Sequence, residues 1–116
     1  MSIDETLYEE LVRLANENKL AAYSEVAPLI GLDMSIDQDR DEIARRLGDI
    51  VFYEHDYGRP MLTALVVHYG NDNNPGEGFF SAAEKLGLYK GSRNPIDRLT
   101  FWANQVRLVH NHWGSA

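Results

Sequence analysis

Apolar residues recur at three- and four-residue steps in much of the chain, which is the spacing of one buried face of an α-helix. This pattern predicts long helices at 4–18, 37–57 and 94–113, and a shorter helix from Phe79 to Gly87 or Gly91. Another short helix is predicted at 25–31, with Ser24 as its N-cap, Pro28 in its opening turn and Gly31 at its end. Helices therefore account for most of the chain.

One stretch, Pro60 to Tyr69, predicts a strand. Its apolar residues run together instead of alternating with polar ones, which indicates burial on both faces. A polar turn at 71–76 follows, and a single strand needs a partner. The candidate partners are the short segment Ala21-Ala22-Tyr23 and an arm near Gly78-Phe79. The predicted fold class is α+β, mostly α, in a single domain over 1–116.

The amino-acid composition excludes several kinds of functional site. The 116 residues include no cysteine, which excludes disulfides, thiolate zinc sites and cysteine nucleophiles. The net charge of −7 divides into −9 for residues 1–58 and +2 for residues 59–116. Any nucleic-acid face must therefore be local, because proteins that bind through phosphate contacts are usually basic throughout. The acidic N-terminus shows no signal peptide, and no apolar run reaches membrane-spanning length, so we expect a cytoplasmic protein.

The order of the predicted elements is that of a winged helix-turn-helix domain. Helix, short extended segment, two helices and a strand would form a winged-helix core at 4–80, and the polar turn would be the wing. Two further helices, at 79–113, would follow this core.

Tyr23-Ser24-Glu25-Val26-Ala27 followed by Ile30-Gly31 resembles the helix-turn-helix of alkylguanine-DNA alkyltransferases and their alkyltransferase-like relatives. The resemblance covers 23–80 and implies a DNA-binding winged helix. That family carries its reactive thiol in a Pro-Cys-His-Arg segment, and Pro60-Met61-Leu62-Thr63 stands at the corresponding place here. Alkyl transfer to a cysteine is therefore excluded, and the resemblance implies the fold alone. The chain is also similar to a set of small bacterial proteins of uncharacterised function.

The leading hypothesis is a non-enzymatic winged-helix module that binds DNA or has a regulatory role. The contacts expected with DNA are basic residues on or beside the third helix and amides of the wing. They are Arg40, Arg45, Arg46, Arg59, Asn71, Asn73 and Asn74.

The alternative is an acidic protein-interaction subunit, inhibitor or adaptor in a bacterial or phage regulatory or defence system. The −9 charge of the first half suits a basic partner or repels nucleic acid. Aromatic residues and an arginine on and near the last helix are the expected partner contacts. They are Tyr89, Arg98, Trp102 and Trp113.

An enzyme is the third class. No nucleophile, metal or cofactor constellation stands out, so neither a metal site nor a cofactor is predicted. The best catalytic set that the sequence offers lies near the ends of the third helix and the strand. It consists of His55, Asp56, His68 and Glu77.

Overall fold

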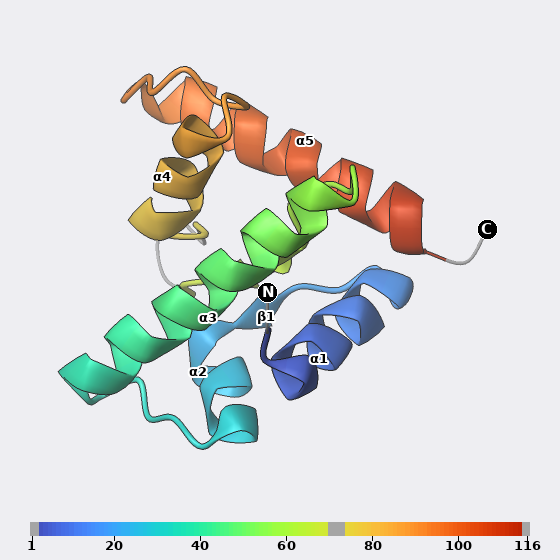
Figure 1. The fold of residues 1–116 in the computed structure, drawn as a ribbon. Coiled ribbons are helices and arrows are strands. Elements are labelled where there is room, and N and C mark those ends of the chain that lie inside the picture. The colour runs from blue at the N-terminus through green and yellow to red at the C-terminus, as the bar shows by residue number, and fades with distance from the viewer. Residues whose placement is uncertain (1–2, 70–73, 115–116) are drawn as a thin grey trace.

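The computed structural model describes residues 3–69 and 74–114 as a mostly helical α+β structure. Its α-helices are α1 (Glu5–Asn16), α2 (Tyr23–Val26), α3 (Asp37–Asp56), α4 (Glu77–Lys85) and α5 (Pro95–Trp113). Two 3₁₀ helices, η1 (Ala27–Ile30) and η2 (Leu62–Leu65), and two short strands, β1 (Ala21–Ala22) and β2 (Val66–Val67), complete it. Helix α3 runs diagonally across the molecule, with α1 and α2 to one side and α4 and α5 to the other (Figure 1).

The first helix confirms the prediction from apolar spacing. Asp4 caps α1, because its carboxylate accepts a hydrogen bond of 3.0 Å from the backbone N–H of Leu7. The predicted cap at Ser24 is wrong, since α2 already begins at Tyr23. The N-terminus of α2 is instead tied by Glu25, whose carboxylate accepts a hydrogen bond of 2.9 Å from the N–H of Ala22. The predicted helix at 25–31 is divided into α2 and η1, and Gly31 ends it with a φ of 74°.

The predicted strand at 60–69 is wrong in its extent. Residues Leu62–Leu65 form η2, and only Val66–Val67 form a strand. Short apolar runs fit a buried helical turn as well as a buried strand, so their periodicity cannot separate the two. The burial prediction is confirmed, because all residues from Met61 to Val67 are buried. Helices α1, α3 and α5 all contact η2, which places this stretch at the centre of the fold.

The sheet consists of two strands in the described residues. Ala21 pairs with Val66 and Ala22 with Val67 in a parallel arrangement, which confirms the first of the two predicted partners. Directly after β2, the N–H of His68 donates a hydrogen bond of 2.8 Å to the carbonyl of Asn74 in an antiparallel bridge. The expected wing residues Asn71 and Asn73 lie outside the described residues.

Helix α5 begins as predicted, with the Asn94 side chain accepting a hydrogen bond of 2.8 Å from the N–H of Ile96. The apolar spacing at 94–113 would place its apolar residues on one buried face, and this is wrong for the first turns. Gln105 and Val109 are buried, whereas Ile96 and Leu99 are 72% and 57% exposed. Gln105 occupies a core position because its side-chain carbonyl accepts a hydrogen bond of 3.1 Å from the buried N–H of Met61. The first turns of α5 therefore present apolar side chains to solvent.

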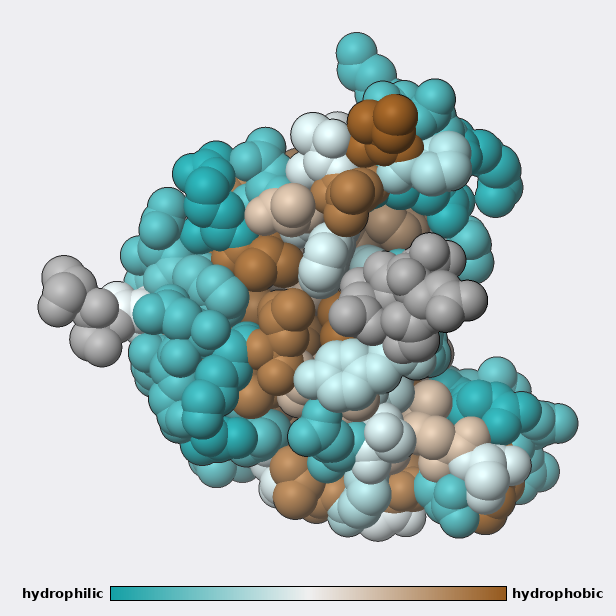
Figure 2. Space-filling model, turned by 180° about the vertical axis from the view of Figure 1, so that it is seen from behind, coloured by the Kyte–Doolittle hydropathy of each residue, from teal (hydrophilic) through white to brown (hydrophobic). Residues whose placement is uncertain are grey.

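Apolar side chains also gather on the surface elsewhere. In the rear view they form an interrupted strip that runs from the top to the bottom of the face, with hydrophilic residues to its left (Figure 2). Within residues 3–69 and 74–114, no helix combines the length and the apolar character needed to cross a membrane.

Candidate binding surfaces

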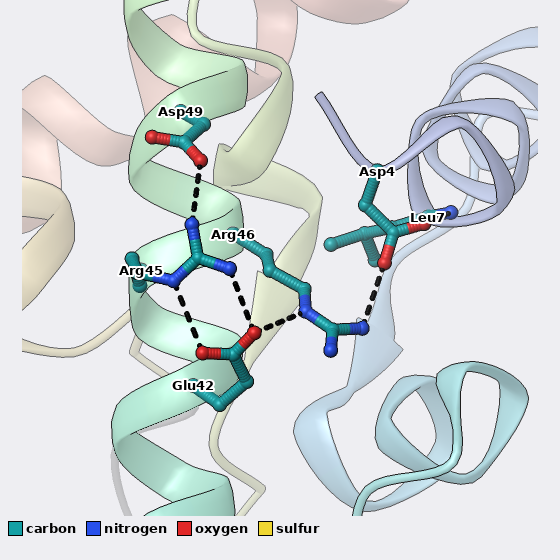
Figure 3. A network of polar contacts seen from close by, with 6 residues as sticks. All are labelled: Asp4, Leu7, Glu42, Arg45, Arg46 and Asp49. Carbon is teal, nitrogen blue, oxygen red and sulfur yellow. Dashed lines mark hydrogen bonds and ion pairs between the residues drawn. The ribbon is translucent and has the colours of Figure 1, made fainter. Parts of the chain in front are cut away.

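The arginines expected to contact DNA on α3 are held by carboxylates of the same chain. Arg45 donates two hydrogen bonds to Glu42, of 3.0 and 2.7 Å, and a third of 3.1 Å to Asp49. Arg46 lies between Glu42, at 2.7 Å, and Asp4 of α1, at 2.9 Å (Figure 3). Hydrogen bonds from both arginines lower the pKa of Glu42 to about 2. The network thus joins α3 to the N-terminus of α1.

The other two arginines of the predicted DNA set are paired as well. Arg40 forms an ion pair with Asp37 and donates a hydrogen bond of 2.8 Å to the carbonyl of Met34. Arg59 is half-buried and faces inward, where it donates two hydrogen bonds of 2.9 Å to the buried carboxylate of Glu54. Neither guanidinium is an uncompensated positive charge.

This pairing extends to all lysines and arginines between residues 3 and 58. Arg13 pairs with Glu10 and Glu17, and Lys19 pairs with Glu17. Over the same residues, several carboxylates have no lysine or arginine within 4 Å: Glu5, Glu9, Glu25, Asp33, Asp39, Asp41 and Asp56. The charge that remains without a partner in this half of the chain is therefore negative.

Asn74 is the one predicted wing residue that the structure describes. Its side-chain oxygen accepts a hydrogen bond of 2.9 Å from the N–H of Gly76, and its backbone carbonyl accepts from His68. Its side-chain oxygen and its backbone oxygen thus both accept hydrogen bonds within the chain.

The predicted partner-binding residues divide between two regions. Trp113 lies at the C-terminal end of α5, edge-on to Tyr8, and the guanidinium of Arg59 lies 5.7 Å from its ring centre. Tyr89 packs on Phe101 at 4.9 Å and donates a hydrogen bond of 2.6 Å to the carbonyl of Ser92. Both side chains pack mainly against the protein itself.

Arg98 and Trp102 line a groove of about 520 Å³, which we call the α5 groove. Trp102 donates a hydrogen bond of 2.8 Å from its indole N–H to the carbonyl of Ala64, which fixes its ring beside the groove. Arg98 pairs with Glu77 through two hydrogen bonds of 2.7 and 3.1 Å and lies 4.6 Å from the ring centre of Phe80. The remaining lining residues are Asn74, Pro75, Glu77, Phe80, Arg93, Pro95 and Leu99.

A second, smaller pocket of about 220 Å³ lies between α3 and the start of α4, and we call it the α3 pocket. One wall is the ring of Tyr23, which stacks on His68 with a centroid distance of 4.1 Å and an interplanar angle of 13°. Thr63 lines the pocket and is 5% exposed. Burial raises the pKa of Tyr23 to about 12.

The structure does not bring together the four residues of the best catalytic set that the sequence offers. His68 and Glu77 both line the α3 pocket, whereas His55 and Asp56 are exposed at the C-terminal end of α3 and do not line it. Over residues 3–69 and 74–114, no three histidine or acidic side chains lie close enough together to hold a metal ion.

Neither the α5 groove nor the α3 pocket was predicted from the sequence. The groove joins residues from 74 to 102, and the pocket joins Tyr23 to Phe79. One sequence signal was available for the pocket, namely Gly48 in the interior of an otherwise well-patterned helix, because an internal glycine weakens a helix.

Comparison of the chain with protein-family models, with curated proteins and with solved structures found no match.

Proposed function

We propose that this protein is a non-enzymatic protein-interaction module of the cytoplasm, an accessory subunit, inhibitor or adaptor, whose partner docks in the α5 groove. The main support for this proposal is that Ile96 and Leu99 of α5 are exposed beside that groove. These two residues are three positions apart and are therefore neighbours on the helix surface. A groove bordered by exposed large apolar side chains is typical of a protein-binding site.

The charge around the groove indicates the chemistry of the partner. Arg93 lines the groove and has no carboxylate within 4 Å among the described residues, whereas Arg98 is neutralised by Glu77. A partner segment with an apolar side chain for the groove and a carboxylate for Arg93 fits both features. Such a contact would bury an apolar centre within a polar rim, which is the usual anatomy of a protein interface.

In this proposal, the acidic surface of residues 3–58 influences which molecules can approach the protein. Its bases are all paired, so the uncompensated carboxylates dominate its surface potential. A surface of this sign repels nucleic acids and favours approach by partners of opposite charge.

The experiment compares Leu99→Glu with Leu29→Glu in the native host. Leu99 and Leu29 are similarly exposed, at 57% and 53%, but only Leu99 lines the α5 groove. We expect proteins that co-purify stoichiometrically with the wild type to be lost with Leu99→Glu and retained with Leu29→Glu, as measured by quantitative mass spectrometry. Equal melting temperatures of the two variants would exclude a folding defect. Retention of the same proteins by both variants would contradict the proposal.

The second candidate is the duplex-binding winged helix that the sequence predicts. It is supported by the element order and by the antiparallel bridge between His68 and Asn74, which stand on either side of the expected wing in the sequence. The paired state of Arg40, Arg45, Arg46 and Arg59 weighs against it, because each phosphate contact would need an existing ion pair to be broken. An anisotropy titration with duplex DNA at low salt tests it, and saturable binding that is lost in Arg45→Ala would favour this candidate over the first.

A further inference from the structure

The α3 pocket has a flat, rigid wall. The stacked rings of Tyr23 and His68 are held from both ends, since the Tyr23 hydroxyl donates a hydrogen bond of 2.7 Å to the carbonyl of Pro75 and the N–H of His68 is bonded to Asn74. Gly76 has a φ of +89°, and a Cβ there would lie 3.1 Å from Nε2 of His68. Glycine is therefore the residue that permits this close approach of the backbone to the ring.

The opposite side of the pocket is kept open by Gly48. This residue lies inside α3, where glycine is disfavoured relative to alanine. Close packing does not require glycine here, because a Cβ at Gly48 would meet no other atom within 4 Å. The same holds for Gly78 at the start of α4. Both glycines leave unfilled space next to apolar side chains such as Ile43 and Phe79.

Thr63 supplies a polar group without a partner. Its hydroxyl is buried and forms no hydrogen bond with any residue that the structure describes. Buried hydroxyls nearly always have a partner, because burial without one is unfavourable. Thr63 lines the pocket, and a molecule bound there can supply that partner once the atoms that cover Oγ1 move aside.

We propose that the α3 pocket binds a small planar aromatic molecule with a single hydrogen-bonding group, whose ring lies along the Tyr23–His68 pair and whose polar atom bonds to the Thr63 hydroxyl. The size agrees with this ligand class, because an apolar cavity of about 150 Å³ already accepts benzene. The 220 Å³ of the α3 pocket leaves room for a two-ring molecule such as indole. Offset or edge contacts with the aromatic wall would add to the apolar contacts.

Indole and indene are the matched probes. They share a two-ring shape, and only indole has an N–H group that can donate to Oγ1 of Thr63. We expect indole to shift the amide NMR signals of Gly48, Gly76 and Gly78 of the whole protein saturably. Indene should bind about fivefold more weakly, the factor expected from the loss of one net hydrogen bond.

Two variants locate the site. Thr63→Val removes the hydroxyl at similar size and should lower the affinity for indole to that for indene, with indene unaffected. Gly48→Leu should fill the pocket and abolish the binding of both probes. Leu99→Glu should leave indole binding unchanged, which separates this site from the α5 groove. Absence of saturable indole shifts in the wild type, or undiminished indole affinity in Thr63→Val, would overturn the proposal.

Discussion

Arg59 and Glu54 form a two-point ion pair, with both hydrogen bonds 2.9 Å long, around a carboxylate that is completely buried. The hydroxyl of Tyr8 donates a third hydrogen bond, of 2.7 Å, to the same carboxylate. Burial, together with this contact to Glu54, raises the pKa of Tyr8 to about 12. The cluster therefore connects α1, the end of α3 and the segment that leads into η2.

Removal of Arg59 should be among the most damaging single substitutions outside the apolar core. Arg59→Ala leaves the Glu54 charge buried without its cation, and we expect a loss of about 3–5 kcal/mol in the free energy of unfolding. Arg13→Ala is the control, because Arg13 also contacts two carboxylates but is exposed, and its loss should be below about 1 kcal/mol. Urea denaturation measures both. Equal losses would show that Glu54 does not depend on Arg59.

The network around Glu42 should make the stability of the fold depend on pH in the acidic range. The pKa of Glu42 is lowered from 4.5 to about 2 in the folded state, so its stabilising contribution is present above pH 4.5 and disappears as the pH falls through 2. Melting curves of the wild type and Glu42→Gln should differ at pH 6 and converge near pH 2. A difference that stays constant over this range would mean that the carboxylate charge is not what the arginines stabilise.

The helices could be predicted from the sequence because each has a repeated apolar face and its own end signals. The cap at Asn94 and the stop at Gly31 are local features, so they needed no knowledge of the rest of the chain. The strand at 60–69 could not be predicted in detail, since burial of every residue from Met61 to Val67 removes the periodicity that separates strand from helix.

The candidate sites were less predictable, because they depend on contacts between distant residues. Arg59 looks like a free surface cation in the sequence, and only the fold places it next to Trp113 of α5. The apolar spacing at 94–113 predicted the helix but not its orientation, in which Gln105 is buried and bonded to Met61 while Ile96 and Leu99 face solvent.

This orientation of α5 predicts effects of different size for two apolar residues on the same helix. Val109→Ala removes side-chain atoms from a fully buried position and should lower the free energy of unfolding by about 1.5–3 kcal/mol. Leu99→Ala changes an exposed side chain and should stay within about 0.5 kcal/mol of the wild type. Chemical denaturation distinguishes the two, and a larger loss for Leu99→Ala would contradict the described orientation.

Gly48 should be replaceable by alanine with a gain in stability. Glycine inside a helix is about 1 kcal/mol less favourable than alanine, and the added Cβ meets nothing within 4 Å. We therefore expect Gly48→Ala to raise the free energy of unfolding by about 1 kcal/mol, and Ala44→Gly, one turn earlier on α3, to lower it by a similar amount. A loss of stability in Gly48→Ala would show that the space at this position is not open.

The most direct test of partner docking on α5 is photo-crosslinking from the α5 surface in the native host. A benzophenone amino acid at Ile96, on the exposed face next to the α5 groove, should give one discrete adduct that mass spectrometry identifies as a single partner protein. The same group at Leu29, which is also exposed but belongs to η1 and not to α5, should not give that adduct. Adducts of the same composition from both positions, or none from Ile96, would contradict the proposal that this protein acts by docking a partner on α5.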